Sequence, residues 1–243
     1  MEIPGIATTP PPLTGATLFG QRWQQLALLH WPVEPAAVAR YFPAGTRPDQ
    51  AGGLTYVGLV PFRMRGAGPG RLPVPYFGTF IEWNVRLYSV DDAGRHGLLF
   101  RSLETQRLLI AALTRAGLGL PYTWAAMSLW HEADEIRYRT GRRWPRAKEP
   151  ITSRLRLRVG APTEPTPLEV WLTARWGLHT SVAGRTVWIP NEHGPWPLHE
   201  AQVLDLDDGL VAAAGVVATG EMLRPLYSPG VRVRFGTPVR LRA

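Results

Sequence analysis

The stretch Thr79-Phe-Ile-Glu-Trp-Asn-Val-Arg-Leu-Tyr88 decides how the fold of this chain is interpreted. Its side chains alternate in character at every second position, and this period predicts a β-strand, because successive strand residues point to opposite faces. Side chains on one face lie about 7 Å apart along the strand. One face is apolar, with Ile81, Trp83, Val85 and Leu87; the other carries Phe80, Glu82, Asn84, Arg86 and Tyr88.

The polar face of this strand has two interpretations. In the simpler one, the apolar face packs on a core and the polar residues lie in water. In the other, the sheet closes on itself and one face must line the interior. Glu82 and Arg86 would then have to pair, because an unpaired buried charge is costly, and Asn84 would orient them. We favour this second interpretation, because aromatic residues at both ends of the row are unusual on a wholly wetted surface. It predicts the floor of a site for an anion or a carbonyl group.

Working outward from this stretch, the pattern predicts many strands on short turns. The strand turns at Asp91–Gly94, returns over residues 97–104, and is followed by a helix over residues 106–116. Another helix is predicted over residues 167–176, a flexible crossing loop over residues 66–75, and a turn at residues 228–230. With about ten strands and two to three helices, the fold class is α+β: a mostly antiparallel, closed or strongly curved barrel-like sheet.

The chain shows no long linker and no shift in composition that would divide it. Residues 1–17 are rich in proline and threonine and predict a loose N-terminal arm. Residues 18–243 are expected to form a single domain. Hydrophobic residues make up 45% of the 243 residues and charged residues 19%, which is typical of a folded globular protein.

Composition excludes several classes of chemistry. The chain has no cysteine, so disulfides, thiolate catalysis and cysteine metal sites are ruled out. Its six histidines fall at no regular metal spacing, and no nucleotide-binding or hydrolase motif occurs. We therefore expect no metal and no cofactor. The N-terminus lacks a signal-peptide pattern and no window approaches the ~18 apolar residues of a membrane span, so we expect a cytoplasmic protein without a membrane partner.

The net charge of +8 comes almost entirely from arginine. Of the 27 basic residues only Lys148 is a lysine. Arg154, Arg156 and Arg158 alternate along one predicted strand and, with Arg232 and Arg234, could face phosphates. Alternating charges are, however, typical of a solvated face, and no aromatic residue interleaves them for base stacking. A nucleic-acid partner is therefore not favoured.

Short motifs spread over residues 21–239 carry a resemblance to a known family. They include His30-Trp-Pro-Val33, Glu82-Trp-Asn-Val-Arg-Leu-Tyr88, Gly119-Leu-Pro-Tyr122, Leu172-Thr-Ala-Arg-Trp176 and His193-Gly-Pro-Trp-Pro-Leu198. As a set they resemble the YqjF-like family of conserved bacterial proteins of unknown function. That family is similar in fold to acetoacetate decarboxylase, whose superfamily packs a closed, barrel-like sheet around a buried pocket.

The resemblance also has implications for individual residues. Phe80-Ile-Glu82 resembles the aromatic-x-Glu strand motif of the decarboxylase. Arg115 and the turn that ends in Tyr122 and Thr123 stand where the decarboxylase has an arginine-rich helix followed by Gly-x-Pro-Lys-Lys. Those two lysines supply the Schiff-base nucleophile and the cation that activates it. The resemblance therefore implies a pocket near Glu82 and Arg115, without imine-forming decarboxylation, because Lys148 lies outside the motif.

Three hypotheses follow for function. The first is a pocket protein for a small carbonyl or carboxylate compound, in which Glu82 titrates and Tyr122 donates a hydrogen bond; if it is an enzyme, it is a lyase- or isomerase-like acid–base catalyst without a Schiff base. The second is a non-catalytic protein whose arginine-rich strands meet an acidic partner or nucleic acid. The third makes Glu82 and Arg86 a structural pair. We favour the first as a binding pocket and leave catalysis and homo-oligomerisation open. Its expected ligand-binding residues are Phe80, Asn84, Arg86, Tyr88 and Arg115.

Overall fold

The central stretch forms β4, Phe80–Asp91, and all 12 of its residues are buried. The structure is a computed structural model that describes residues 3, 5–13, 15–70 and 72–241. Within these residues the strands before the second helix are β1 (Phe19–Val33), β2 (Thr46–Pro48), β3 (Thr55–Pro69), β4 and β5 (His96–Thr105). The later strands are β6 (Tyr122–Glu132), β7 (Glu135–Trp144), β8 (Thr152–Pro162), β9 (Gly177–Val182), β10 (Arg185–His193), β11 (His199–Asp208), β12 (Leu226–Phe235) and β13 (Val239–Arg240). The helices are α1 (Pro35–Val38), η1 (Ala39–Tyr41), α2 (Leu108–Leu118), α3 (Pro167–Thr173) and α4 (Leu210–Ala213).

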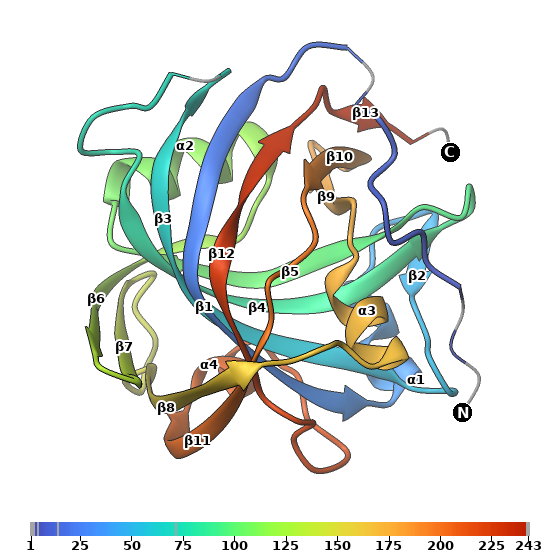
Figure 1. The fold of residues 1–243 in the computed structure, drawn as a ribbon. Helices are drawn as coiled ribbons and strands as arrows, with labels where there is room; N and C mark the ends of the chain where they lie inside the picture. The colour runs from blue at the N-terminus through green and yellow to red at the C-terminus, as the bar shows by residue number, and fades with distance from the viewer. Residues whose placement is uncertain (1–2, 4, 14, 71, 242–243) are drawn as a thin grey trace.

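The strands close into two rings that share β12, β1, β3, β4 and β5 (Figure 1). The first ring is completed by β6, β7, β8 and β11. The second is completed by β9 and β10. Two rings are possible because β5 and β12 change partners along their length: Leu98 pairs with β9, whereas Leu103 pairs with β6. The expected fold class, a mostly antiparallel and strongly curved sheet, is confirmed.

Both faces of β4 are covered by packed side chains. Ile81, Trp83, Val85 and Leu87 lie in the large apolar core of the first ring. On the other face, Phe80 and Tyr88 belong to two further apolar clusters, one of which includes Trp171 of α3. Between them Glu82, Asn84 and Arg86 are only 3%, 5% and 6% exposed. The simpler interpretation, in which these polar side chains lie in water, is therefore wrong.

A capped helix positions Arg175 at the second ring. Thr166 accepts a hydrogen bond from the Glu169 amide and donates its own amide to the Glu169 carboxylate, which forms a capping box at the start of α3. The helix ends at Thr173, three residues earlier than predicted. Trp171 and Arg175 are both buried at this end of the ring.

Two local turn signals are overridden by strand pairing. β3 continues to Pro69, so the first part of the predicted crossing loop is strand, because Gly68 pairs with Gly20 of β1. β12 likewise runs through Ser228 and Gly230, where a turn was predicted, because both residues pair with β1.

In the N-terminal arm, the Ala7 carbonyl accepts a hydrogen bond from Trp176 Nε1 at 2.7 Å. Among the described residues, no helix has the length and apolar character needed to cross a bilayer.

Candidate functional site

A cavity of about 240 Å³ lies against the polar face of β4. Every strand of the second ring contributes to its wall, together with Thr114 and Leu118 of α2. The lining is mainly aliphatic and aromatic, and its buried polar groups are Glu82, Tyr122 and Asn191. An apolar cavity with a few convergent polar groups is the usual form of a small-molecule site.

The Glu82 carboxyl is held in this cavity by Tyr122. The Tyr122 hydroxyl donates a hydrogen bond to Glu82 Oε2 at 2.8 Å. Burial raises the pKa of Glu82 to about 7, although the hydrogen bond from Tyr122 and the side-chain amide of Asn84 offset part of the rise. Burial and the neighbouring Glu82 charge raise the pKa of Tyr122 well above its ordinary value. Near neutral pH Glu82 can therefore both accept and release a proton, as a general acid–base group must.

A glycine turn delivers Tyr122 to the cavity. Helix α2 ends at Gly119, which adopts the left-handed conformation with φ +63° that favours glycine at this position. A Cβ on Gly119 would stand 2.0 Å from the Ser181 carbonyl oxygen, so no larger residue fits the close approach to β9. The chain then enters β6, where Tyr122 pairs with Leu103 of β5.

A smaller chamber of about 10 Å³ adjoins this cavity and contains Arg86. Trp23, Leu98 and Asn191 line both spaces. Within the described residues Arg86 makes no ion pair with a carboxylate, and its Nε has no hydrogen-bond partner. Because an arginine cannot be deprotonated in a protein, Arg86 is a buried positive charge without an acidic partner among the described residues.

The charges around the chamber do not balance. Arg175 is paired with Asp49. Burial alone would raise the pKa of Asp49, but the hydrogen bond from His96 and the charge of Arg175 hold this pKa below its ordinary value. The pKa of His193 is lowered by burial and by Arg86, so this imidazole is neutral near pH 7. Of the two guanidinium groups only Arg175 has a carboxylate partner, so the net charge of the group is positive.

Unpartnered polar atoms gather at this chamber. Trp23 Nε1, Arg86 Nε, Arg175 Nη2 and Asn191 Oδ1 are all buried without a hydrogen bond in the described part of the chain, and all four residues line the chamber. Asn84 Oδ1, next to Arg86 on the same face of β4, is also without a partner. Buried polar atoms in native proteins are nearly always hydrogen-bonded to protein or to ordered water, so water or a polar group of a ligand is expected to supply the partners here.

The structure brings some of the predicted site residues together and separates others. Glu82 and Tyr122 meet in the cavity, and Arg86 lines the chamber. Phe80, Asn84, Tyr88 and Arg115 line neither space. Phe80 packs in an apolar cluster, Asn84 is buried, Tyr88 binds His30 at 2.8 Å, and Arg115 is exposed.

The expected Glu82–Arg86 pair is wrong, and with it the hypothesis of a structural pair. No such ion pair occurs among the residues described. Four strand residues span about 13 Å, so the two groups stand at opposite ends of the row.

Four further residues at the site were not predicted. Arg175 and His193 fall within two of the motifs that carry the family resemblance, so those motifs are the signal that could have identified them. Trp23 and Asn191 have no comparable signal, because they reach the chamber through pairing of β1 and β10 with β12, which is distant in sequence.

Two positions bear on lysine chemistry. Thr123 binds Glu104, which Arg142 also binds, and this buried network does not line the cavity. Lys148 is exposed between β7 and β8 and does not line the cavity either. No cluster of three or more potential metal ligands occurs among the described residues.

The arginine ladder on β8 is neutralised by acidic neighbours. Arg154 pairs with Asp205 at 3.2 Å and Arg156 with Glu135 at 3.3 Å. Arg158 also pairs with Glu135, at 3.1 Å. The feature that motivated a nucleic-acid or acidic partner is thus a set of surface ion pairs.

Comparison with known proteins places these observations in a family. The sequence profile of DUF2071, described as an uncharacterized conserved protein, matches residues 20–232. The uncharacterized protein YqjF of Bacillus subtilis (strain 168) is 29% identical over 191 residues, which cover 77% of this chain and 78% of YqjF.

Three solved structures with the same fold are distant in sequence. Acetoacetate decarboxylase from Legionella pneumophila aligns with a TM-score of 0.67 at 13% identity, over 100% of this chain and 92% of its own. The enduracididine biosynthesis enzyme MppR, complexed with pyruvate, aligns with a TM-score of 0.63 at 14% identity, over 96% and 91%. An acetoacetate decarboxylase-like enzyme from Sphingomonas wittichii RW1 gives 0.62 at 14% identity, over 94% of each chain. At these identities the likeness shows the fold alone.

Proposed function

The chain belongs to the DUF2071 family of uncharacterized conserved proteins with an acetoacetate decarboxylase-like fold, and from this premise we propose that it binds a small organic acid that also carries a carbonyl group. The observation that carries this proposal is the buried, unpaired Arg86 in the small chamber that adjoins the cavity of Glu82.

The ligand carboxylate is assigned to Arg86. A buried guanidinium is strongly unfavourable unless an anion with good hydrogen-bond geometry accompanies it, and a carboxylate can accept two parallel N–H bonds from arginine. MppR, which has the same fold, is described as complexed with pyruvate, a carboxylate beside a carbonyl. This supports the ligand class by analogy of fold only.

The carbonyl end of the ligand is assigned to Glu82 and Tyr122. With a pKa of about 7, Glu82 is partly ionised at neutral pH and can remove a proton from a carbon next to the carbonyl. The Tyr122 hydroxyl, which donates to Glu82 at 2.8 Å, can donate instead to the carbonyl oxygen. This chemistry needs no lysine, which fits a chain whose Lys148 is exposed.

A binding experiment tests the anion end. Wild type, Arg86→Met and the surface control Arg156→Met are titrated calorimetrically with oxo acids of increasing length and with neutral ketones of the same size. We expect 4-oxo to 6-oxo acids to bind more tightly than pyruvate, because Glu82 and Arg86 are about 13 Å apart along the strand. Arg86→Met should weaken oxo-acid binding at least tenfold and leave ketone binding unchanged. Equal affinity of wild type and Arg86→Met for every acid would contradict the proposal.

A solvent-exchange experiment tests the acid–base end. In D₂O, the protein should catalyse exchange of the hydrogens next to the carbonyl of a bound oxo acid, measured by proton NMR. Glu82→Gln should abolish catalysed exchange while the acid still binds. Tyr122→Phe should slow exchange by about 10²-fold, the scale of one lost oxyanion donor. If wild type binds an oxo acid but does not catalyse exchange, the binding proposal stands and the proposed acid–base catalysis is wrong.

A further inference from the structure

Three arginines stand directly opposite one another across β3, β1 and β12. Arg22 of β1 is the register partner of Arg65 on one side and of Arg232 on the other. All three are exposed. Like charges directly opposite on neighbouring strands destabilise a sheet, so this arrangement is unfavourable unless something negative lies over it.

The described residues do not supply that negative charge. None of the three arginines forms an ion pair within the part of the chain that the structure describes, whereas each arginine of the β8 ladder does. Glu192, the acidic residue on the wall of the same groove, is already paired with Arg234. The arginine row across β3, β1 and β12 therefore differs from the β8 ladder in having no acidic partners among the described residues.

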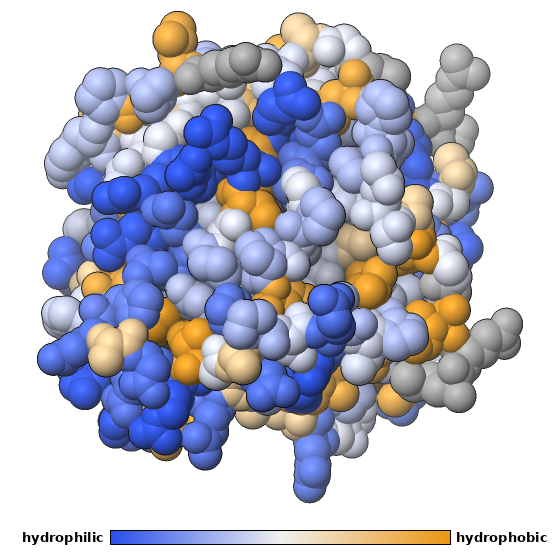
Figure 2. All heavy atoms as spheres, in the orientation of Figure 1, coloured by the Kyte–Doolittle hydropathy of each residue, from blue (hydrophilic) through white to orange (hydrophobic). Residues whose placement is uncertain are grey.

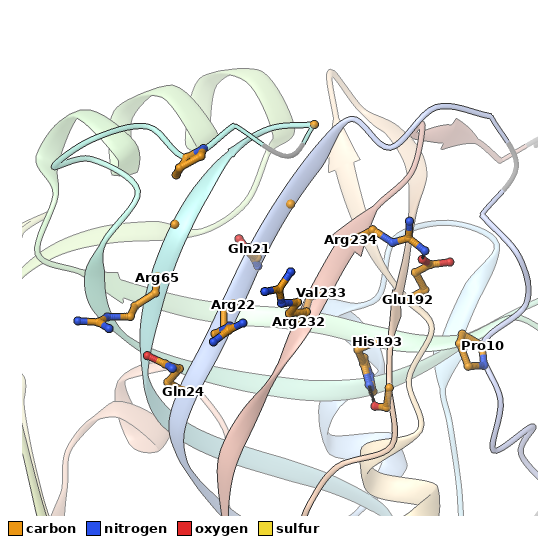
Figure 3. Close-up of a pocket in the computed structure, with 15 residues that line it drawn as sticks. Pro10, Gln21, Arg22, Gln24, Arg65, Glu192, His193, Arg232, Val233 and Arg234 are labelled. Atoms are coloured by element: carbon orange, nitrogen blue, oxygen red, sulfur yellow. Dashed lines mark hydrogen bonds and ion pairs between the residues drawn. The ribbon is translucent and has the colours of Figure 1, made fainter.

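The three arginines line a groove of about 970 Å³ (Figure 3). Figure 2 shows strongly hydrophilic side chains gathered over the same region of β3, β1 and β12. Gln21 lines both the groove and the cavity of Glu82, and His193 lines both the groove and the chamber of Arg86. Because Gln21 and Arg22 are successive strand residues, the arginine row lies on the outer face of the wall whose inner face borders the cavity.

We propose that the groove binds the diphosphate of a small molecule. Arginine forks match phosphate oxygens, and adjacent strands set the outer arginines about 10 Å apart, which suits two linked phosphates better than one. This site stands on the arginine row alone and is independent of the proposed function. The phosphates belong to a small molecule rather than a nucleic acid, because no Phe, Tyr or Trp among the described lining residues offers a stacking surface for bases.

The test compares two variants that remove the same charge. One replaces Arg22, Arg65 and Arg232 by glutamine, and the matched control replaces Arg154, Arg156 and Arg158 by glutamine. Inorganic pyrophosphate and phosphate are titrated calorimetrically into both variants and wild type. We expect pyrophosphate to bind wild type more tightly than phosphate, the groove variant to lose at least tenfold in affinity, and the control to stay within threefold. No pyrophosphate binding by wild type, or equal losses in the two variants, would overturn the site.

Two further arms separate the alternatives. A single-stranded oligonucleotide that binds wild type more tightly per phosphate than pyrophosphate, and loses this in the groove variant, would overturn the small-molecule assignment. Oxo-acid binding is measured on the same groove variant, which should retain it. Loss of pyrophosphate binding with retained oxo-acid binding supports the groove site and leaves the cavity proposal intact. Failure of pyrophosphate binding alone would remove the groove site and not the proposed function.

Discussion

Glu82 and Arg86 lie on the same face of the same strand, but burial affects the charge of each side chain differently. A carboxyl can lose its charge, and the raised pKa of Glu82, about 7, shows burial shifting it toward the neutral form. A guanidinium has no such option. Arg86 therefore keeps a buried charge with no acidic partner among the described residues. A bound anion would stabilise that charge, whereas Glu82 can become neutral without one.

The raised pKa of Glu82 predicts a stability profile. The folded state holds this proton more tightly than the unfolded state does, since the pKa rises from 4.5 to about 7. Below pH 4.5 both states are protonated, so the penalty is absent there and grows as the pH rises to about 7. The unfolding free energy of wild type should fall relative to Glu82→Gln by about 3 kcal/mol across this window. Urea unfolding at a series of pH values measures the difference, and parallel profiles would show that the Glu82 pKa is not raised.

At the scale of the element, the fit between β3 and β4 sets the position of Arg86. Gly58 is the register partner of Arg86. A Cβ on Gly58 would lie 3.1 Å from Arg86 Cγ, from Arg86 Nε and from His30 Cδ2. Because Gly58 has no side chain, the aliphatic part of the Arg86 side chain can lie against β3 at this position.

This contact predicts the effect of Gly58→Ala. The added methyl group must displace the Arg86 side chain by a few tenths of an ångström, so oxo-acid binding should weaken about tenfold although the charge is retained. Gly141→Ala is the matched control, because its Cβ would meet Thr152 at an ordinary 3.7 Å in another strand. Calorimetric titration of both variants distinguishes them. Unchanged binding by a folded Gly58→Ala protein would mean that the position of Arg86 does not limit affinity.

At the scale of the whole molecule, the two rings cannot be separated without breaking shared strands. β12, β1, β3, β4 and β5 carry the core of the first ring on one face and the cavity and apolar clusters of the second on the other. Loss of either ring would expose a buried face of the same five strands. The single domain expected for residues 18–243 therefore has a physical basis in this sharing.

We accordingly expect one cooperative unfolding transition. Amides of β7, which belongs only to the first ring, and of β10, which belongs only to the second, should exchange with solvent at the same limiting free energy as global unfolding. Native-state hydrogen exchange in increasing denaturant measures both. If β9 and β10 open at a clearly lower free energy than β7, the second ring is an independent unit and the single-domain expectation fails.

Local patterns in the amino-acid sequence were enough to predict that residues 79–88 form a strand and which of their side chains share a face. The period of two over residues 79–88 places Glu82, Asn84 and Arg86 in one row, because strand geometry depends only on neighbouring residues. The motif ending at Tyr122 pointed to its place near Glu82 through family resemblance, and the two do form a hydrogen bond at 2.8 Å.

Burial, pairing and charge balance were decided by the tertiary structure. Whether β4 is wetted on one face depends on β9, β10 and α3, which lie far along the chain and cover that face only once the second ring closes. The same closure places Asn191 and Arg175 beside Arg86. The period of a strand is local, whereas desolvation is set by whatever distant segments pack against it, and desolvation is what raises the pKa of Glu82 and leaves Arg86 without a partner.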